Sequence, residues 1–144
     1  MNRLILQVLL AMHPNIRGGD ISFILELGPD VPEIVADGIQ IQQVLLNLIS
    51  NAIDSVNASG SSNRTSRPLS GLIFQKRRSW VIVEDTGIGI SDPGRIFEAF
   101  FTTKVKGMGI GLAIWQSIIA AHGGALVAAN RDEGGARFSF SLPR

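Results

Sequence analysis

Residues 38–56 read GIQIQQVLLNLISNAIDSV, and this segment decides how the rest of the chain is organised. At about 100° per residue, a helix would place polar side chains on one narrow face and aliphatic side chains over most of the remainder. The polar face comprises Gln40, Gln43, Asn47, Asn51 and Asp54. Asp37 is a suitable N-cap, and Gln40 three residues later completes a capping box. The spacing therefore predicts a long helix over about 38–56.

The polar face of this helix carries amides, whereas an ordinary solvated face carries Lys and Glu. Asparagine is a poor helix former, so the two in mid-helix, Asn47 and Asn51, need a reason. Their neutral oxygens are ligands that suit a hard cation such as Mg²⁺ beside a polyphosphate. The alternative is an ordinary amphipathic helix whose polar face is exposed to solvent and binds no ligand. Helix spacing alone does not separate the two interpretations.

Residues 81–90 read VIVEDTGIGI, an apolar run that ends in an acid and two spaced glycines. The run predicts a strand with Asp85 at its end, where a buried carboxylate is costly unless something donates to it. An exocyclic amine of a ligand base is one such donor. Gly87 and Gly89 would let the backbone approach a ligand closely. The alternative is a tight turn after a strand.

Residues 107–111, GMGIG, open an apolar helix. The free N–H groups and the dipole of a helix start favour an anion. Lys104 and Lys106 lie just upstream and could reach phosphate oxygens. The pattern is neither the dinucleotide fingerprint nor the P-loop. The alternative is a flexible glycine loop beside two solvated lysines.

The remaining patterns predict a two-layer α/β sandwich with a mixed sheet and helices on one face. An amphipathic first helix around 4–12 is ended by Gly18 and Gly19. Expected strands cover 21–27, 72–74, 80–83, 125–129 and 136–142, with a turn at Gly134 and Gly135. A further helix is expected over about 109–122, a short extended piece at 34–35, and a flexible polar loop over 57–70.

Composition limits the classes of protein to which the chain can belong. Its 144 residues suit one domain, 1–144, and 45% of them are hydrophobic, as in globular proteins. The chain lacks cysteine, which excludes disulfides and thiolate metal sites. Its net charge is +1, and no aromatic residues interleave the basic cluster Arg64, Arg67, Lys76, Arg77 and Arg78, so no nucleic acid is expected. No apolar run is long enough for a membrane span, and Gln7 interrupts the run that faintly resembles a signal peptide.

Four segments in order resemble the boxes of sensor histidine kinases. Residues 43–55 (QVLLNLISNAIDS) resemble the N box, 85–90 (DTGIGI) the G1 box, 96–104 (IFEAFFTTK) the F box and 107–114 (GMGIGLAI) the G2 box. The similarity is greatest to the oxygen- and nitrogen-regulation class and covers about 21–143. It implies the Bergerat ATP-binding fold, which type II topoisomerases, a heat-shock chaperone and mismatch-repair ATPases share.

The resemblance also implies a site for ATP and Mg²⁺. Asp85 would bind the adenine amino group, Asn51 would ligate Mg²⁺, and Asn47 would lie beside the phosphates. Residues 88–108 would form a lid, with Lys104 over the triphosphate. The implied catalytic residues are Asn47, Asn51 and Lys104. The implied nucleotide-binding residues are Asn47, Asn51, Asp85, Gly87, Gly89, Ile90, Thr103, Lys104, Gly107, Met108, Gly109, Ile110, Gly111 and Leu112.

Two features of the lid depart from or qualify this pattern. The stretch 91–95 is a few residues shorter than usual in the family, which puts the adenine-side anchor of the lid in question. Phe97, Phe100 and Phe101 would anchor the lid, and we expect Phe97 and Phe100 to pack in the core as well.

The resemblance implies transfer of the γ-phosphoryl of ATP to a histidine on a separate dimerisation domain, with a response regulator downstream. His13, followed by Pro14, and His122, at a helix end, are expected to be structural. We expect the domain alone to be monomeric and cytoplasmic, as a free protein or as part of a membrane-bound sensor. One alternative is an ATPase clamp, but such proteins carry a glutamate base where this chain has Asn47, which cannot accept a proton. The other is a non-catalytic nucleotide-binding module.

Overall fold

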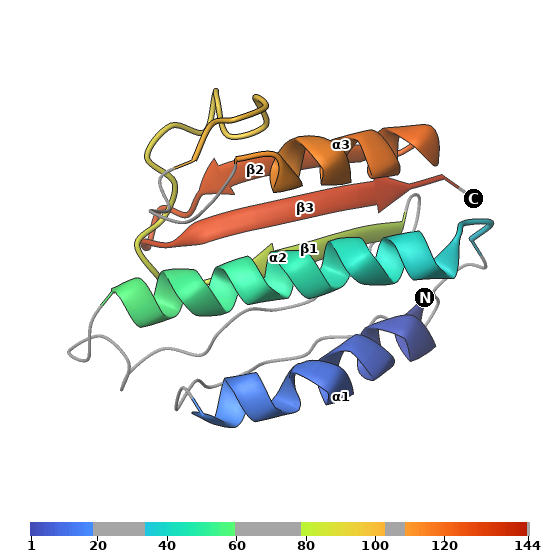
Figure 1. Cartoon of the computed structure of the whole chain (residues 1–144), viewed down its shortest axis with the longest axis horizontal. Helices are drawn as coiled ribbons and strands as arrows, with labels where there is room; N and C mark the ends of the chain where they lie inside the picture. Colours follow the sequence, from blue (N-terminus) through green and yellow to red (C-terminus); the bar gives the residue numbers. More distant parts are fainter. Residues whose placement is uncertain (19–33, 60–78, 103–108, 144) are drawn as a thin grey trace.

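The computed structural model describes residues 1–18, 34–59, 79–102 and 109–143 (Figure 1). Its elements are α1 (Asn2–Gly18), α2 (Gly38–Ala58), β1 (Ser79–Glu84), α3 (Gly111–Ala121), β2 (Ala125–Asn130) and β3 (Ala136–Leu142). The predicted strands at 21–27 and 72–74 and most of the predicted loop lie outside the described residues. The loop prediction was wrong for Asn57 and Ala58, which complete the last turn of α2. No helix in the described part of the chain is long and apolar enough to cross a membrane.

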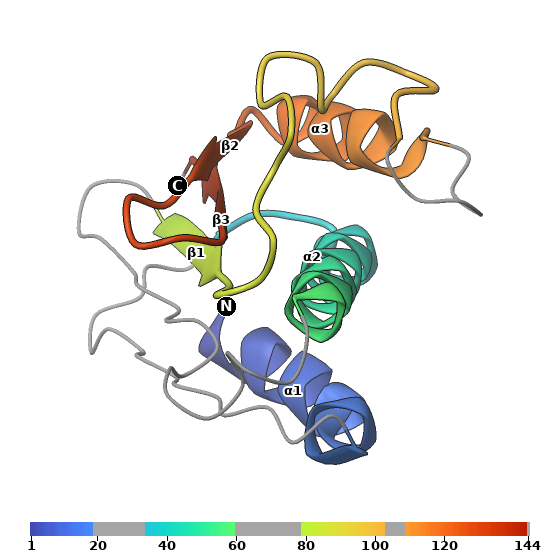
Figure 2. The same ribbon diagram turned by 90° about the vertical axis from the view of Figure 1, so that its left-hand side faces the viewer.

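The sheet has the strand order β1-β3-β2, and both pairings are antiparallel. Figures 1 and 2 place α2 and α3 on one face of this sheet, with α1 packed beside α2. The predicted two-layer α/β arrangement is therefore confirmed. The described strands show no parallel pair, so the mixed character expected of the sheet would depend on residues outside this part of the chain.

One hydrophobic core lies between the layers. The aliphatic face of α2 supplies eight buried residues: Ile41, Val44, Leu45, Leu48, Ile49, Ala52, Ile53 and Val56. Alternate residues of the sheet face them, and Phe140 and Leu142 are fully buried. Helix α1 contributes Ile5, Val8 and Met12 from the predicted apolar stripe. The period of 3.6 in the helices and of 2 in the strands thus produces one shared interior.

His122 links the N-terminal end of α2 to the C-terminal end of α3. The Asp37 carboxylate caps α2 by accepting from Ile39 N (2.9 Å) and Gln40 N (3.3 Å), as predicted. The prediction that Gln40 completes a capping box was wrong. The Asp37 N–H donates to His122 Nε2 at 3.1 Å rather than to the Gln40 side chain. Since Nε2 accepts, the ring proton is on Nδ1, which lies 2.8 Å from the Ile118 carbonyl oxygen. The predicted structural role of His122 is confirmed.

Replacing His122 with alanine should destabilise the chain by about 1–2 kcal/mol, because the Asp37 N–H and the end of α3 lose a shared partner. Urea unfolding of the purified chain measures this change. His13→Ala is the matched control, since His13 is exposed on α1. Equal losses in the two variants would show that the contact between the helix ends contributes nothing.

Candidate functional site

Asp85 stands directly after β1 and is only 2% exposed. Its Oδ1 accepts three hydrogen bonds, from Gly87 N (2.8 Å), Ser55 Oγ (3.1 Å) and Ala136 N (3.3 Å). The Asp85 N–H in turn donates to the Ala136 carbonyl at 2.9 Å. No residue in the described part of the chain donates to Oδ2. One carboxylate oxygen is therefore fixed in place, and the other is available to an external donor such as an exocyclic amine.

The environment of this carboxylate disfavours its charged form. Burial raises the pKa of Asp85 above its ordinary value, against the opposing effects of the donors from Gly87, Ala136 and Ser55 and of the Arg131 charge. A buried acid that is costly to ionise is more typical of a functional site than of a core. The interpretation of Asp85 as a mere turn residue is weaker for this reason.

The geometry of the loop requires both glycines after Asp85, Gly87 because of packing and Gly89 because of its backbone dihedral. A Cβ on Gly87 would lie 2.2 Å from Ser55 Oγ and 2.3 Å from the Ser55 carbonyl carbon, so the loop is pressed against the backbone of α2. Gly89 has φ +76°, which an L side chain rarely adopts. The close contact with α2 therefore requires glycine at position 87, and the sequence alone did not suggest this contact.

The amides predicted as ligands lie on α2 with the geometry that the spacing implied. Asn47 and Asn51 are half-buried, while Gln40, Gln43 and Asp54 on the same face are exposed. This face is opposite to the one that packs in the core. Oxygen donors suited to a hard cation therefore line the side of α2 that the core leaves accessible.

The glycine-rich end of the site is held by the F-box segment. Gly109 has φ +69°, so α3 begins at Gly111, slightly later than predicted. Its carbonyl accepts from Phe100 N at 2.8 Å, and a Cβ on Gly109 would lie 2.5 Å from the Phe100 carbonyl carbon. Ile110, the N-cap of α3, makes no side-chain cap. Within the described residues, the first N–H groups of α3, around Gly111 and Leu112, receive no side-chain cap from Ile110, which suits the binding of an anion.

Thr103, Lys104, Gly107 and Met108 lie outside the described residues, so their predicted places over the triphosphate stay predictions. Segment 91–95 forms turns, in which Arg95 N donates to the Asp92 carbonyl at 3.2 Å, and the next turn joins Glu98 N to the Arg95 carbonyl at 2.9 Å.

The three phenylalanines of the F box behave differently. Phe97 is partly buried against the core, as expected. The expectation that Phe100 packs in the core was wrong, since it is 79% exposed. Its φ of 67° lies in the left-handed region, which residues other than glycine rarely adopt. Phe101 is half-buried beneath the Arg95 guanidinium, whose carbon lies 4.8 Å from the ring centroid.

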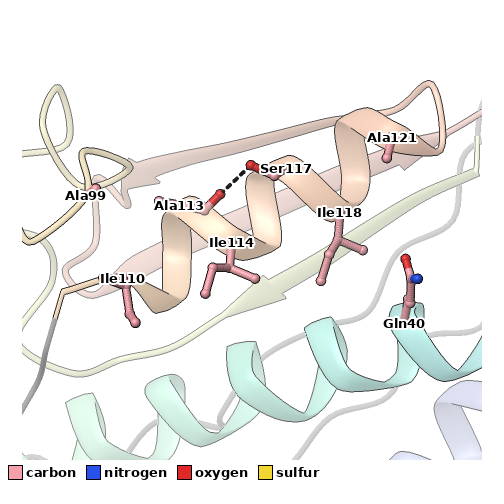
Figure 3. Close-up of a pocket in the computed structure, with 8 residues that line it drawn as sticks. All are labelled: Gln40, Ala99, Ile110, Ala113, Ile114, Ser117, Ile118 and Ala121. Carbon is pink, nitrogen blue, oxygen red and sulfur yellow. Dashed lines mark hydrogen bonds between the residues drawn. The ribbon is translucent and has the colours of Figure 1, made fainter.

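An apolar groove of about 540 Å³ runs along α3 from the glycine-rich end (Figure 3). Its walls are formed by Gln40, Ala99, Ile110, Ala113, Ile114, Ser117, Ile118 and Ala121. Ile110, Ile114 and Ile118 point from α3 toward α2, and Gln40 closes the far end. The groove therefore begins where the predicted phosphate site ends.

Several residues around Asp85 were missed by sequence reasoning. Ser55 donates to its carboxylate, and Arg131 Nη1 donates to its carbonyl oxygen at 2.9 Å. Asn130 bonds the backbone of Ile90 on both sides. These contacts span 30 to 46 residues of sequence, so no local pattern reports them.

Comparison with known proteins agrees with this geometry. The family model described as histidine kinase-, DNA gyrase B- and HSP90-like ATPase matches residues 36–144. The sensor protein FixL of Bradyrhizobium diazoefficiens is 42% identical over 123 residues, which are 84% of this chain and 23% of FixL. The chain thus spans about a quarter of that relative's length.

Solved structures give the same result. The nucleotide-free catalytic domain of histidine kinase ThkA is 33% identical with a TM-score of 0.80, covering 99% of this chain and 91% of that one. ThkA in complex with response regulator protein TrrA matches with a TM-score of 0.78 and 31% identity, covering 99% of this chain and 40% of that one. Full-length ShkA in complex with AMPPNP matches with 0.76 and 33% identity, covering 97% and 29%.

The segments that match include the buried aspartate, the amide face of α2 and the glycine-rich start of α3. The chain belongs to the histidine kinase-, DNA gyrase B- and HSP90-like ATPase family, and within it to the ATP-binding catalytic domains of sensor histidine kinases.

Proposed function

We propose that this domain holds Mg-ATP between α2, the 85–90 loop and the start of α3, and transfers the γ-phosphoryl group to a histidine on a separate dimerisation domain. The observation that carries the proposal is the Asp85 carboxylate, which has one oxygen fixed by three donors and the other without a donor from the described residues. An adenine amino group supplies the missing donor. The AMPPNP bound to ShkA, a 33% identical kinase, is consistent with this choice.

Each predicted site residue has a role in this proposal. Gly87, Gly89 and Ile90 line the adenine side, and Asn51 ligates Mg²⁺, with Asn47 beside the phosphates. Thr103, Lys104, Gly107 and Met108 belong to the lid over the triphosphate. The backbone N–H groups near Gly109, Ile110, Gly111 and Leu112 take up phosphate charge. Mg²⁺, when bound, supplies further neutralisation of the phosphate oxygens.

Phosphoryl transfer needs positioning and charge neutralisation more than covalent help from the protein. Asn47 holds the position where ATPases of this family carry a glutamate, and an amide cannot take a proton from water. We therefore favour transfer to an imidazole over hydrolysis. The further partners would be a response regulator, as TrrA is for ThkA, and we propose a monomeric domain that works in the cytoplasm.

Asn51→Ala should weaken binding of Mg-ATP but leave metal-free ATP binding nearly unchanged. The reason is that an amide oxygen serves Mg²⁺ and makes no equivalent contact with the base. Titration calorimetry with ATP, in excess Mg²⁺ and then in a chelator, measures both affinities. Gln43→Ala, on the exposed part of the same face, is the control. If Asn51→Ala loses equal affinity with and without Mg²⁺, the assignment as ligand is wrong.

The apolar groove along α3 is where we place the histidine-bearing domain. It begins at Ile110, next to the helix start that faces the phosphates, so a helix seated in it would bring its histidine toward the γ-phosphate. Phe100, the residue after Ala99 of the groove wall, is 79% exposed. Exposed apolar side chains gathered in this way indicate a protein partner rather than a free surface.

Ile114→Glu should abolish most transfer to a separately supplied histidine domain while leaving ATP affinity unchanged. A charge placed in the groove must be desolvated when a helix docks, which is costly. Labelling of the acceptor domain from γ-labelled ATP measures the transfer. Val127→Glu is the matched control, because Val127 on β2 is 47% exposed and Ile114 is 49% exposed. Equal transfer by the two variants would remove the groove from the docking surface.

A further inference from the structure

The side-chain amide of Asn130, the last residue of β2, makes two hydrogen bonds with the backbone of Ile90. Its Oδ1 accepts from Ile90 N at 2.7 Å, and its Nδ2 donates to the Ile90 carbonyl at 2.8 Å. This pair of bonds copies the exchange between two residues of an antiparallel ladder, with a side-chain amide in place of one strand. We call these two bonds the amide clamp. A side chain that presented only an acceptor or only a donor could not form it.

The neighbouring residue holds the other end of the same loop. Arg131 Nη1 donates to the Asp85 carbonyl at 2.9 Å. Gly135 lies directly beneath that carbonyl, since an added Cβ would be 1.9 Å from the oxygen. The β2–β3 turn therefore fixes both Asp85, at the start of the loop, and Ile90, at its end.

Gly89 ties the clamp to the loop between these ends. A Cβ on Gly89 would lie 2.8 Å from Asn130 Oδ1, so any side chain there would collide with the clamp. After Ile90 the chain leaves the sheet, and Ser91, Pro93, Gly94 and Arg95 are exposed. The clamp thus lies at the boundary between a loop fixed to the sheet and the segment that leads to the F box.

We propose that Asn130 is a positioning residue for nucleotide binding: it sets where the 91–102 segment departs relative to the Asp85 carboxylate. The proposal rests on the proposed function, because the fixed distance matters only if the base is held at Asp85 while the segment after Ile90 closes over the nucleotide. Asn130 itself lies outside the four boxes and acts through Ile90 rather than by contact with ATP.

The test uses Asn130→Asp, which is nearly isosteric and keeps the acceptor but, when ionised, loses the donor and places a charge near the Ile90 carbonyl. At pH 8 we expect about tenfold weaker ATP binding by calorimetry, because the clamp retains at most one of its two bonds. Measured relative to the wild type at the same pH, the affinity should recover as the pH falls and the new carboxyl becomes protonated, since a protonated carboxyl can both donate and accept. Urea unfolding at both pH values separates this result from a role in folding alone, since the affinity should be lost at pH 8 in a variant that is still folded.

Asn130→Ala should show the same loss of affinity at pH 8 with no recovery on acidification. Asp132→Asn, at an exposed position in the same turn, is the control and should bind as the wild type does. Hydrogen exchange of the Ile90 amide gives a readout without nucleotide and should be faster in Asn130→Ala than in wild type.

The outcomes separate the two proposals. If the wild type binds ATP and Asn130→Ala binds it equally well, the positioning role is wrong and the proposed function stands. The role is equally wrong if the affinity of Asn130→Asp relative to the wild type at the same pH is not restored by acidification. If the wild type itself does not bind ATP, the proposed function fails, and the positioning role fails with it.

Discussion

Asp85→Asn should lower the affinity of the chain for ATP at least about tenfold, while the fold stays as stable as the wild type or becomes more stable. The loss follows because an amide nitrogen replaces Oδ2, so that a donor faces the adenine amino group where an acceptor stood, and a charge-assisted hydrogen bond is worth about 1.5–3 kcal/mol. The gain in stability follows because asparagine keeps an oxygen for the donors at Oδ1 and removes a buried charge.

The pH dependence of the free energy of unfolding provides a second test of this prediction. Burial raises the native pKa of Asp85 above its unfolded value, so the fold favours the protonated form. That contribution to the free energy of unfolding is fully present below the unfolded pKa and is lost as the pH rises through the raised native pKa. The variant cannot titrate at this position, so its stability relative to the wild type should increase from acid to neutral pH.

Calorimetry with ATP and GTP and urea unfolding at several pH values measure the two effects. Asp132→Asn is the control, because it removes an exposed acid and should change neither quantity. Equal ATP affinity in Asp85→Asn and wild type would end the assignment of Asp85 to adenine. A variant that loses affinity together with several kcal/mol of stability would instead make Asp85 a structural residue.

The parts of this molecule that the sequence predicts are those governed by local periodicity. The helix over Gly38–Ala58 follows from its apolar spacing and from the Asp37 cap, both of which act within a few residues. The hairpin of β2 and β3 follows from strand alternation around Gly134 and Gly135, whose φ values of 93° and 88° need glycine. Asp85 could be singled out because an acid at the end of a buried strand is costly on any fold.

The contacts that complete the site depend instead on which strands become neighbours. Asp85 receives Ser55 from α2 and Ala136 from β3 only because β1 pairs with β3 beneath that helix. His122 takes the Asp37 N–H for the same kind of reason, across 85 residues. Phe100 shows where sequence reasoning fails, since core packing was expected of it, whereas its side chain is exposed and its φ is positive. A backbone dihedral of this kind leaves no signature in composition or period.

Incubated alone with Mg-ATP, the chain should acquire no acid-labile phosphoryl label and should hydrolyse ATP only slowly. His122 is unsuited as acceptor because both ring nitrogens are occupied, Nδ1 near the Ile118 carbonyl and Nε2 by the Asp37 N–H. His13 is exposed on α1, which packs beside α2, and precedes Pro14 within that helix. Hydrolysis lacks a base at Asn47, and general-base help is typically worth about 10²–10⁴-fold in rate.

Adding a histidine-bearing helical domain should produce acid-labile label on that domain, because it supplies the imidazole that this chain does not offer. Transfer between separate molecules will be slower than in a tethered kinase, since it forgoes the effective concentration of a linker. Labelling from γ-labelled ATP, followed by acid treatment, measures the reaction, and an acceptor domain with its histidine replaced by alanine is the control. Stoichiometric acid-labile label on this chain by itself would overturn an external acceptor. Rapid release of phosphate without any acceptor would instead favour the ATPase function, because water would then be the nucleophile. Hydrolysis would in that case proceed although Asn47 stands where such enzymes carry a glutamate.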